Sequence, residues 1–235
     1  MKTTSMKMLK TIYDKTSLEN KRVILSMLQL HPDAVILDCG CNTGDFAVEI
    51  AARIGTTRVF GVEFVKEAAD IAESKGIEVY LANLNQRLPV ENECFDFVLA
   101  NQVIEHLSET DVFIKEIYRV LKPGGYAIIS TNNLAALHNI LSLLLGKQPF
   151  PAHVSNEVVT GLLLKSMCVE HKSRGSVHMR IFTYSSLKEL FEYHKFKVGK
   201  IVSVGYYPLV GKLANLMSRL DPRHATYLTM KVRRI

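Results

Sequence analysis

The stretch VILDCGCNTGDF at residues 35–46 decides the fold of this chain. Residues 34–39 form a short, continuous apolar run, which is typical of a strand buried on both faces of a sheet. A loop with two glycines follows at 40–44, and residues 45–54 then carry apolar side chains at helical spacing. This order predicts a ligand site at the loop, because ligands of open α/β sheets bind beyond the carboxyl ends of the strands.

The same alternation of strand and helix continues along the chain. Apolar patterns predict further strands at 57–62, 77–82, 95–100, 126–131, 196–204 and 225–234, and helices at 17–30, 65–75, 109–120, 133–145, 183–194 and 208–220. Ser17 is the expected N-cap of the first helix, Thr183 or Ser185 that of a later one, and residues 122–125 (KPGG) predict a helix stop and a turn. Strands that alternate with helices predict an open, mostly parallel sheet covered on both faces.

We expect a single domain over residues 1–235, because no linker rich in Gly, Ser or Pro divides the chain. Residues 1–32 are predicted to form an N-terminal helical lid, and residues 132–180 a helical insertion near the substrate site, where the alternation lapses. Five leucines of this insertion suit one buried helix face: Leu134, Leu137, Leu141, Leu144 and Leu145. The alternatives are that this helix lines a pocket for a hydrophobic substrate or touches a membrane.

The composition is that of a globular protein, with 48% hydrophobic and 22% charged residues among 235. The net charge of +6 is uneven, because residues 165–235 hold 14 Lys and Arg against 4 Asp and Glu. We interpret this excess as a solvated surface rather than as an RNA or membrane site. Four cysteines without a disulfide framework, and no predicted signal peptide or membrane span, favour a cytoplasmic protein. The pair Cys168 and His171 lacks a second ligand pair, so no metal is predicted.

The residues around the loop indicate which ligand binds there. Glu63 ends the second predicted strand, where a carboxylate accepts hydrogen bonds from the two ribose hydroxyls of a nucleoside. Gly40 and Gly44 let a ligand approach the backbone, and Asn42 tolerates the positive φ that glycine usually supplies. The carboxylate of Asp38 would repel the pyrophosphate of NAD, whereas it suits the ammonium and sulfonium groups of S-adenosylmethionine (SAM).

The motifs resemble those of class I SAM-dependent methyltransferases, whose first motif is written D-x-G-x-G-x-G. The similarity starts at VILDCGCNTG and continues through GVEFVKEAADIA at 61–72, the stretch 82–107 and EIYRVLKPGGYAIISTNN at 116–133. Within the class, the chain is most similar to the ubiquinone-biosynthesis type, called type 11, with weaker similarity at 178–198. The resemblance implies a doubly wound, mostly parallel, seven-stranded Rossmann-like sheet with a last antiparallel strand and an insertion after the fifth strand.

The resemblance also implies roles for individual residues in SAM binding. Asp38 and the carbonyl of Asn101 would act near the methionine amino group, and the backbone of Gly40, Cys41, Asn42 and Gly44 would line the methionine part. Glu63 would bind the ribose. Phe64 would pack on the adenine, and Asn83 and Leu84 would read the adenine edge. Asn42 and Asn83 depart from the family pattern, which usually has Gly and Asp at these positions. The amide oxygen of Asn83 can still accept a hydrogen bond, at the lower strength of an uncharged acceptor.

His106 is the candidate catalytic residue, because a general base just after the fourth predicted strand would lie near the reacting methyl group. The alternative is a histidine that only packs below the cofactor. His178 and Arg180 either reach the substrate or close the insertion on the sheet, and we favour the structural role.

The predicted function is SAM-dependent methyl transfer to a small molecule with an oxygen or carbon nucleophile, such as a hydrophobic, lipid-linked or sugar intermediate. Residues 100–103 (ANQV) lack the prolines of the motif that nucleic-acid amine methyltransferases carry there, so a nucleic-acid substrate is disfavoured. Peripheral membrane contact stays open. The alternatives are a non-catalytic SAM-binding or partner-binding protein, an RNA or protein methyltransferase and, more distantly, a nicotinamide-dependent oxidoreductase.

Overall fold

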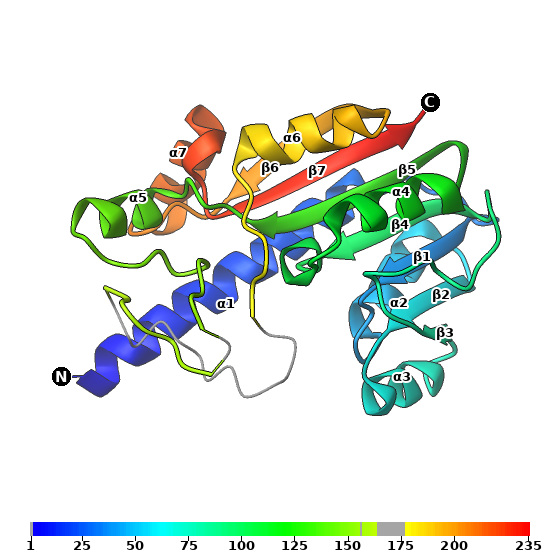
Figure 1. Cartoon of the computed structure of the whole chain (residues 1–235), viewed down its shortest axis with the longest axis horizontal. Coiled ribbons are helices and arrows are strands. Elements are labelled where there is room, and N and C mark those ends of the chain that lie inside the picture. The colour runs from blue at the N-terminus through cyan, green and yellow to red at the C-terminus, as the bar shows by residue number, and fades with distance from the viewer. Residues whose placement is uncertain (1, 156, 164–176) are drawn as a thin grey trace.

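One mixed sheet forms the centre of the molecule. The computed structural model describes residues 2–155, 157–163 and 177–235, and within these ranges the sheet has seven strands in the order β3-β2-β1-β4-β5-β7-β6 (Figure 1). The strands are β1 (Val35–Cys39), β2 (Arg58–Glu63), β3 (Glu78–Leu81), β4 (Phe95–Asn101), β5 (Leu121–Asn132), β6 (Phe196–Val204) and β7 (Tyr227–Arg234). Strand β7 runs antiparallel to β5 and β6, whereas the other pairs are parallel. The predicted doubly wound α/β sheet with an antiparallel last strand is confirmed.

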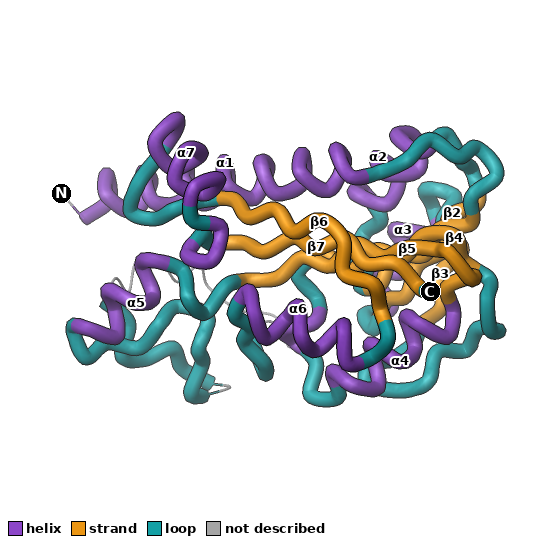
Figure 2. Tube along the Cα trace, turned by 90° about the horizontal axis from the view of Figure 1, so that it is seen from above, coloured by secondary structure: helices purple, strands orange, loops and turns teal. Residues whose placement is uncertain are grey.

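Helices cover both faces of the sheet. They are α1 (Lys2–Met27), α2 (Asp45–Ile54), α3 (Lys66–Glu73), α4 (Thr110–Val120), α5 (Leu137–Leu144), α6 (Tyr184–Tyr193) and α7 (Gly211–Leu220), with the 3₁₀ helices η1 (Ile104–His106) and η3 (Pro222–His224). Figure 2 shows α1, α2 and α7 on one face, and α4, α5 and α6 on the other. Ile24 and Ile50 fill the core on the first face, and Phe113 and Phe191 fill it on the second. Because both faces are covered, all five residues of β1 are buried, which explains its continuous apolar sequence.

The expected roles of Ser17 and of residues 122–125 at element ends were wrong. Ser17 lies inside α1, which begins at Lys2, because no Gly or Pro interrupts the sequence before His31 and Pro32. The predicted turn at 122–125 is part of β5, which begins directly where α4 ends. The pairing of β5 with β4 shifts register there and Gly124 has a φ of +76°, so the strand starts irregularly instead of following a turn.

The helix expected at 133–145 begins only at Leu137. Asn133 forms a bridge with Phe182, and its side-chain oxygen accepts a hydrogen bond from Ala135 N (3.0 Å). Such an Asx turn offers the backbone an alternative to the helix. At α6 the expected capping is confirmed, since the Thr183 hydroxyl accepts from Ser186 N.

Helix α5 does not bury the leucine face that its sequence predicted. Its buried residues are Asn139 and Ser142, while Leu141, Leu144 and Leu145 are between 39% and 77% exposed. The Asn139 amide donates to Asn133 O (3.0 Å) and accepts from Phe150 N (3.3 Å), so hydrogen bonds to the flanking loops fix the polar side inward.

Part of the predicted insertion at 132–180 lies outside the described residues, namely 156 and 164–176, which include Cys168 and His171. In the rest of the chain, no helix is both long and apolar enough to cross a membrane. The lid role of 1–32 and the substrate role of the insertion stay predictions.

Candidate cofactor-binding site

A cavity of about 580 Å³ opens at the carboxyl ends of β1 to β4, a size within the usual range for small-ligand sites. Many of the residues predicted from sequence line it: Gly40, Asn42, Glu63, Phe64, Asn83, Leu84 and the candidate base His106. The topology explains why they meet, because parallel neighbouring strands bring their carboxyl ends to one edge of the sheet.

The loop after β1 has the backbone that a bound ligand needs. Gly40, Asn42 and Gly44 all have positive φ, at 73°, 49° and 77°, so the prediction for Asn42 is confirmed. A Cβ at Gly40 would lie 2.7 Å from a methyl group of Val103, so a side chain there would collide with this lining residue. Gly40 N also donates to Val62 O (2.7 Å), which fixes the loop to β2.

Glu63 joins the loop after β1 to the turn after β2. Its carboxylate accepts hydrogen bonds from the backbone N–H groups of Asn42 (2.9 Å), Phe64 (2.8 Å) and Val65 (2.9 Å). A carboxylate has about four acceptor positions, so these three bonds leave capacity for a ribose hydroxyl. Glu63 therefore shapes the site and lines it at once.

Asp38 places a buried negative charge beneath the loop. Its side chain is 6% exposed, and burial first, then the nearby Glu63 carboxylate, raise the pKa of Asp38 to about 7. Lys21 of α1 acts in the opposite direction. A cationic ligand such as an amino acid ammonium would stabilise this carboxylate, whereas a pyrophosphate would destabilise it.

Asn83 and Leu84 lie in the segment after β3, on the far wall of the cavity. The Asn83 side-chain oxygen accepts from Asn85 N (2.9 Å) and from the Asn85 amide (3.0 Å). Asn85 in turn accepts from Ser108 N (2.9 Å) and Glu109 N (3.0 Å), just before α4. This chain of bonds holds the segment in place and leaves the Asn83 oxygen already engaged within the protein.

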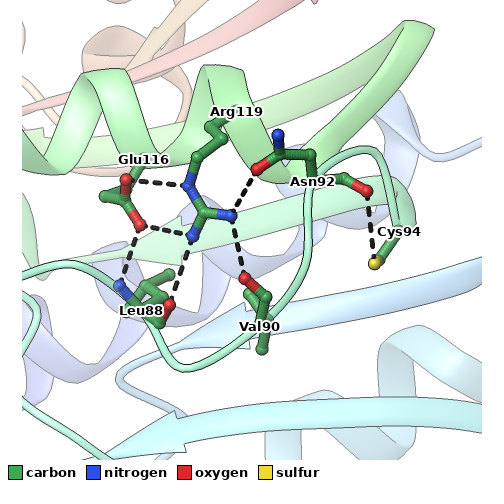
Figure 3. A network of polar contacts seen from close by, with 6 residues as sticks. All are labelled: Leu88, Val90, Asn92, Cys94, Glu116 and Arg119. Atoms are coloured by element: carbon green, nitrogen blue, oxygen red, sulfur yellow. Dashed lines mark hydrogen bonds and ion pairs between the residues drawn. The ribbon is translucent and has the colours of Figure 1, made fainter.

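The same segment is clamped further along by Arg119 of α4, as Figure 3 shows. Its guanidinium donates to the carbonyl oxygens of Leu88 (3.2 Å) and Val90 (2.8 Å) and to the side chain of Asn92 (2.9 Å). It also forms a two-point ion pair with Glu116, at 2.6 and 2.9 Å. Although burial acts to raise the pKa of Glu116, Arg119 holds that pKa below its ordinary value.

His106 lies at the rim of the cavity, in η1. Its Nδ1 is 3.1 Å from Val177 O. A carbonyl oxygen only accepts, so Nδ1 carries the proton and a neutral ring has its basic lone pair on Nε2. The His178 ring lies 4.9 Å from that of His106, between centroids.

The segment with His178 and Arg180 docks on η1. The backbone N–H groups of Met179 and Arg180 donate to Glu105 O at 2.7 and 3.1 Å, and the Arg180 guanidinium donates to Ser108 O (3.2 Å). These bonds agree with the structural role that we favoured for the pair. They also place His178 beside the candidate base.

A group of possible metal ligands lies at this rim, although the sequence predicted none. Within the described residues, Glu105, His106 and His178 each offer one ligand atom, and these atoms lie within 4.8 Å of one another. Burial raises the pKa of Glu105 to about 7, against the hydrogen bonds from Thr131 and Asn132 that act to lower it. The prediction that no metal binds stays untested.

The remaining predicted residues do not line the cavity: Asp38, Cys41, Gly44 and Asn101. Cys41 packs in the core on the α1 side, and Gly44 lies so close to Ala72 and Ile77 that a Cβ would collide with Ile77. The Asn101 side chain accepts from Asn20 of α1 (3.3 Å).

Several lining residues were not predicted: Val62, Val65, Ala68, Ala82, Asn85, Gln102, Val103 and Leu107. Most are apolar, and they are neighbours in sequence of predicted residues. Their position in the sequence next to the motif residues was the available signal for a place in the cavity. In sequence, however, an apolar residue that lines a cavity cannot be told from one that packs in the core.

The comparisons with known proteins agree with this geometry. Residues 37–129 match the family model of a methyltransferase domain. The chain is 35% identical over 122 residues to the mitochondrial ubiquinone biosynthesis O-methyltransferase of Rattus norvegicus, covering 48% of this chain and 35% of the relative. It is 30% identical over 117 residues to the ubiquinone/menaquinone biosynthesis C-methyltransferase of Geotalea daltonii, covering 46% of this chain and 50% of the relative.

A solved structure of a SAM-dependent methyltransferase from Thermotoga maritima superposes with a TM-score of 0.64 at 20% identity, covering 96% of this chain and 92% of the other. Residues 37–129 therefore match a methyltransferase domain, and the whole chain has the fold of solved SAM-dependent methyltransferases. It spans about a third to a half of the length of the two curated relatives named above. SAM is therefore the cofactor of this domain, and the positive-φ loop after β1 and the Glu63 carboxylate beside the cavity fit it.

Cofactor binding to this chain is expected to depend on pH through Asp38. The carboxyl is largely protonated below pH 7 in the free protein, and an ammonium ligand lowers its pKa, so binding releases a proton. The affinity for S-adenosylhomocysteine should therefore fall about tenfold for each pH unit below about 6.5. Calorimetric titrations between about pH 5.5 and about pH 7 test this, and Asp38→Asn should flatten the dependence. An unchanged slope in the variant would assign the proton to another group.

Proposed function

We propose that this chain transfers a methyl group from SAM to an oxygen or carbon nucleophile of a small, hydrophobic molecule. The observation that carries the proposal is the cavity itself, whose lining brings the glycine loop, Glu63 and His106 together. The relatives named for ubiquinone and menaquinone biosynthesis support an aromatic, lipid-linked acceptor.

The bound cofactor supplies a methyl group already activated by its positive sulfur. The protein then has to orient the two reactants, which contributes about 7–11 kcal/mol in well-aligned cases. Glu63 would hold the ribose, the buried Asp38 carboxylate beneath the loop would stabilise the cationic methionine end, and Gly40 would let the cofactor lie against the backbone. His106 Nε2 accepts the proton that an acceptor hydroxyl loses as it is methylated.

Methyl transfer from labelled SAM is the test. Two probes represent the two acceptor types, an alkyl catechol for oxygen and a demethylated naphthoquinol for carbon, with transfer RNA as a third. Label in either quinol-type product supports the proposal. Label in the RNA alone, or S-adenosylhomocysteine binding without transfer to any acceptor, would overturn it in favour of the alternative functions.

Replacing His106 by glutamine is expected to lower kcat for the catechol about 100-fold, the lower end of the range for a lost general base. The KM for SAM should change less than about threefold, because the residue lies at the rim of the cavity. His31→Gln, at an exposed position before β1, is the matched control. A kcat that stays within a few-fold of the original would show that His106 only packs.

A further inference from the structure

Helix α1 buries two polar residues in the stripe that it turns toward the protein. Between residues 11 and 27 its buried residues are Thr16, Asn20, Ile24 and Met27, which recur every three or four positions and so share one face. Figure 2 shows the helix running along one face of the sheet. A buried stripe is ordinarily apolar, because a polar group there costs free energy unless it is hydrogen-bonded. Asn20, which is 3% exposed, is therefore held in place by its partners.

The partners of Asn20 are side chains of three different strands. Its Nδ2 donates to Ser130 Oγ of β5 (2.9 Å) and to Asn101 Oδ1 of β4 (3.3 Å), and its Oδ1 accepts from Thr229 Oγ1 of β7 (2.6 Å). Ser130 and Thr229 are fully buried. A buried asparagine that bonds across an interface fixes one register of a helix, as it does in coiled coils. Asn20 therefore fixes where α1 sits on β4, β5 and β7.

The bond to Asn101 connects α1 to the wall of the cofactor cavity. Asn101 is the last residue of β4, and the next two residues, Gln102 and Val103, line the cavity. Gln102 has a φ of +57°, which residues other than glycine rarely adopt, and its N–H donates to Ser130 O (2.8 Å). Such a backbone conformation persists only where the surrounding structure holds it. Asn20 bonds both the residue before this turn and Ser130 beside it.

The wall formed by Gln102 and Val103 has little room to shift. Because a Cβ at Gly40 would collide with a Val103 methyl group, the wall and the loop after β1 lie closer than a residue with a side chain would allow. A small displacement at the end of β4 therefore changes the shape of the cavity between the wall and the loop. A wall that is already in place favours binding, because the ligand does not have to order it.

We infer that Asn20 is a positioning residue for the cofactor. Through Asn101 and Ser130 it holds the carboxyl end of β4 in the conformation that places Gln102 and Val103 in the cavity wall. Asn20 itself lies outside the cavity lining, so it acts on the cofactor only through these residues. The inference rests on cofactor binding at this cavity, which is part of the proposed function, and does not depend on which acceptor is methylated.

Calorimetric titration of the full chain with S-adenosylhomocysteine tests the inference. Asn20→Leu keeps a side chain of similar size but removes the amide, and it should weaken binding about tenfold, the loss expected from a buried hydrogen bond. Asn101→Ala removes the acceptor at the end of β4 and should weaken binding by a similar factor. The double variant should bind about as weakly as Asn20→Leu alone, because both changes break the same connection. Losses that multiply would show that Asn20 acts independently of Asn101, and would overturn the inference.

Thr229→Val is the matched control, because it removes a buried hydroxyl that bonds Asn20 and leaves the donor to Asn101 in place. It should lower the melting temperature as Asn20→Leu does, but keep the affinity within about twofold of the original. Affinity losses that follow the losses in melting temperature across all variants would show a purely structural role and overturn the inference. Unchanged affinity in Asn20→Leu would overturn it and leave the proposed function intact, whereas no binding by the unaltered chain would overturn both.

Discussion

Replacing Glu63 by alanine is expected to weaken the binding of S-adenosylhomocysteine about 1,000-fold, since hydrogen bonds to a charged group contribute roughly 1.5–3 kcal/mol each. The ligand would lose the acceptor that we propose for its ribose hydroxyls. The protein also loses the carboxylate that holds the N–H groups of Asn42, Phe64 and Val65, so the loop after β1 is no longer fixed to the turn after β2. Calorimetric titration of the purified variant measures the change.

Glu67 supplies the matched control for this experiment. It is an exposed glutamate in the first turn of α3, four residues along the chain and outside the cavity lining, so Glu67→Ala should leave the affinity unchanged. Glu63→Gln should give an intermediate loss, because its amide keeps one acceptor oxygen but turns an N–H₂ group toward backbone donors. Unchanged binding in Glu63→Ala would refute the ribose role of this residue.

Replacing Arg119 by alanine is expected to lower the free energy of unfolding by about 3–5 kcal/mol, the usual cost of removing one partner of a buried ion pair. The side chains of Arg119 and Glu116 are 16% and 11% exposed, so the variant leaves a buried carboxylate without its partner. It also frees the carbonyl oxygens of Leu88 and Val90 in the segment after β3 (Figure 3). Urea unfolding followed by circular dichroism measures the change.

Lys115, on the same helix α4 but exposed, is the control, and Lys115→Ala should change the free energy of unfolding by less than about 0.5 kcal/mol. Arg119→Lys keeps the charge but loses the two-point geometry, so an intermediate loss is expected. Because the pKa of Glu116 is lowered in the folded state, the contribution of the pair is present above about pH 4.5 and declines below it. A loss below about 1 kcal/mol in Arg119→Ala would show that solvent replaces the clamp.

Much of the fold was predictable because its signals are local. The strand and helix patterns of residues 34–132 place most elements within a few residues of their observed bounds. The exceptions arise where a local hydrogen bond competes with the helix, and the apolar pattern does not record such bonds. An example is the Asx turn of Asn133, after which α5 begins later than predicted. The lining by Gly40, Asn42 and Glu63 was predictable for a related reason, since residues that follow parallel strands share one edge of the sheet.

The sequence by itself therefore determined the α/β class and the glycine loop after β1, because periodicity and positive-φ residues are encoded within a few neighbouring positions. Only the tertiary structure decided which side of α5 and α7 faces the protein. The leucines of α5 predict burial, but hydrogen bonds from Asn139 to loops on either side turn them outward; in α7 the buried Ala214 makes the contact and Leu216 stays exposed. The tertiary structure also decided that His178 lies beside His106 and that Arg119 donates to the carbonyl oxygens of Leu88 and Val90. These contacts join residues about 30 to 70 positions apart, so no short-range sequence pattern records them.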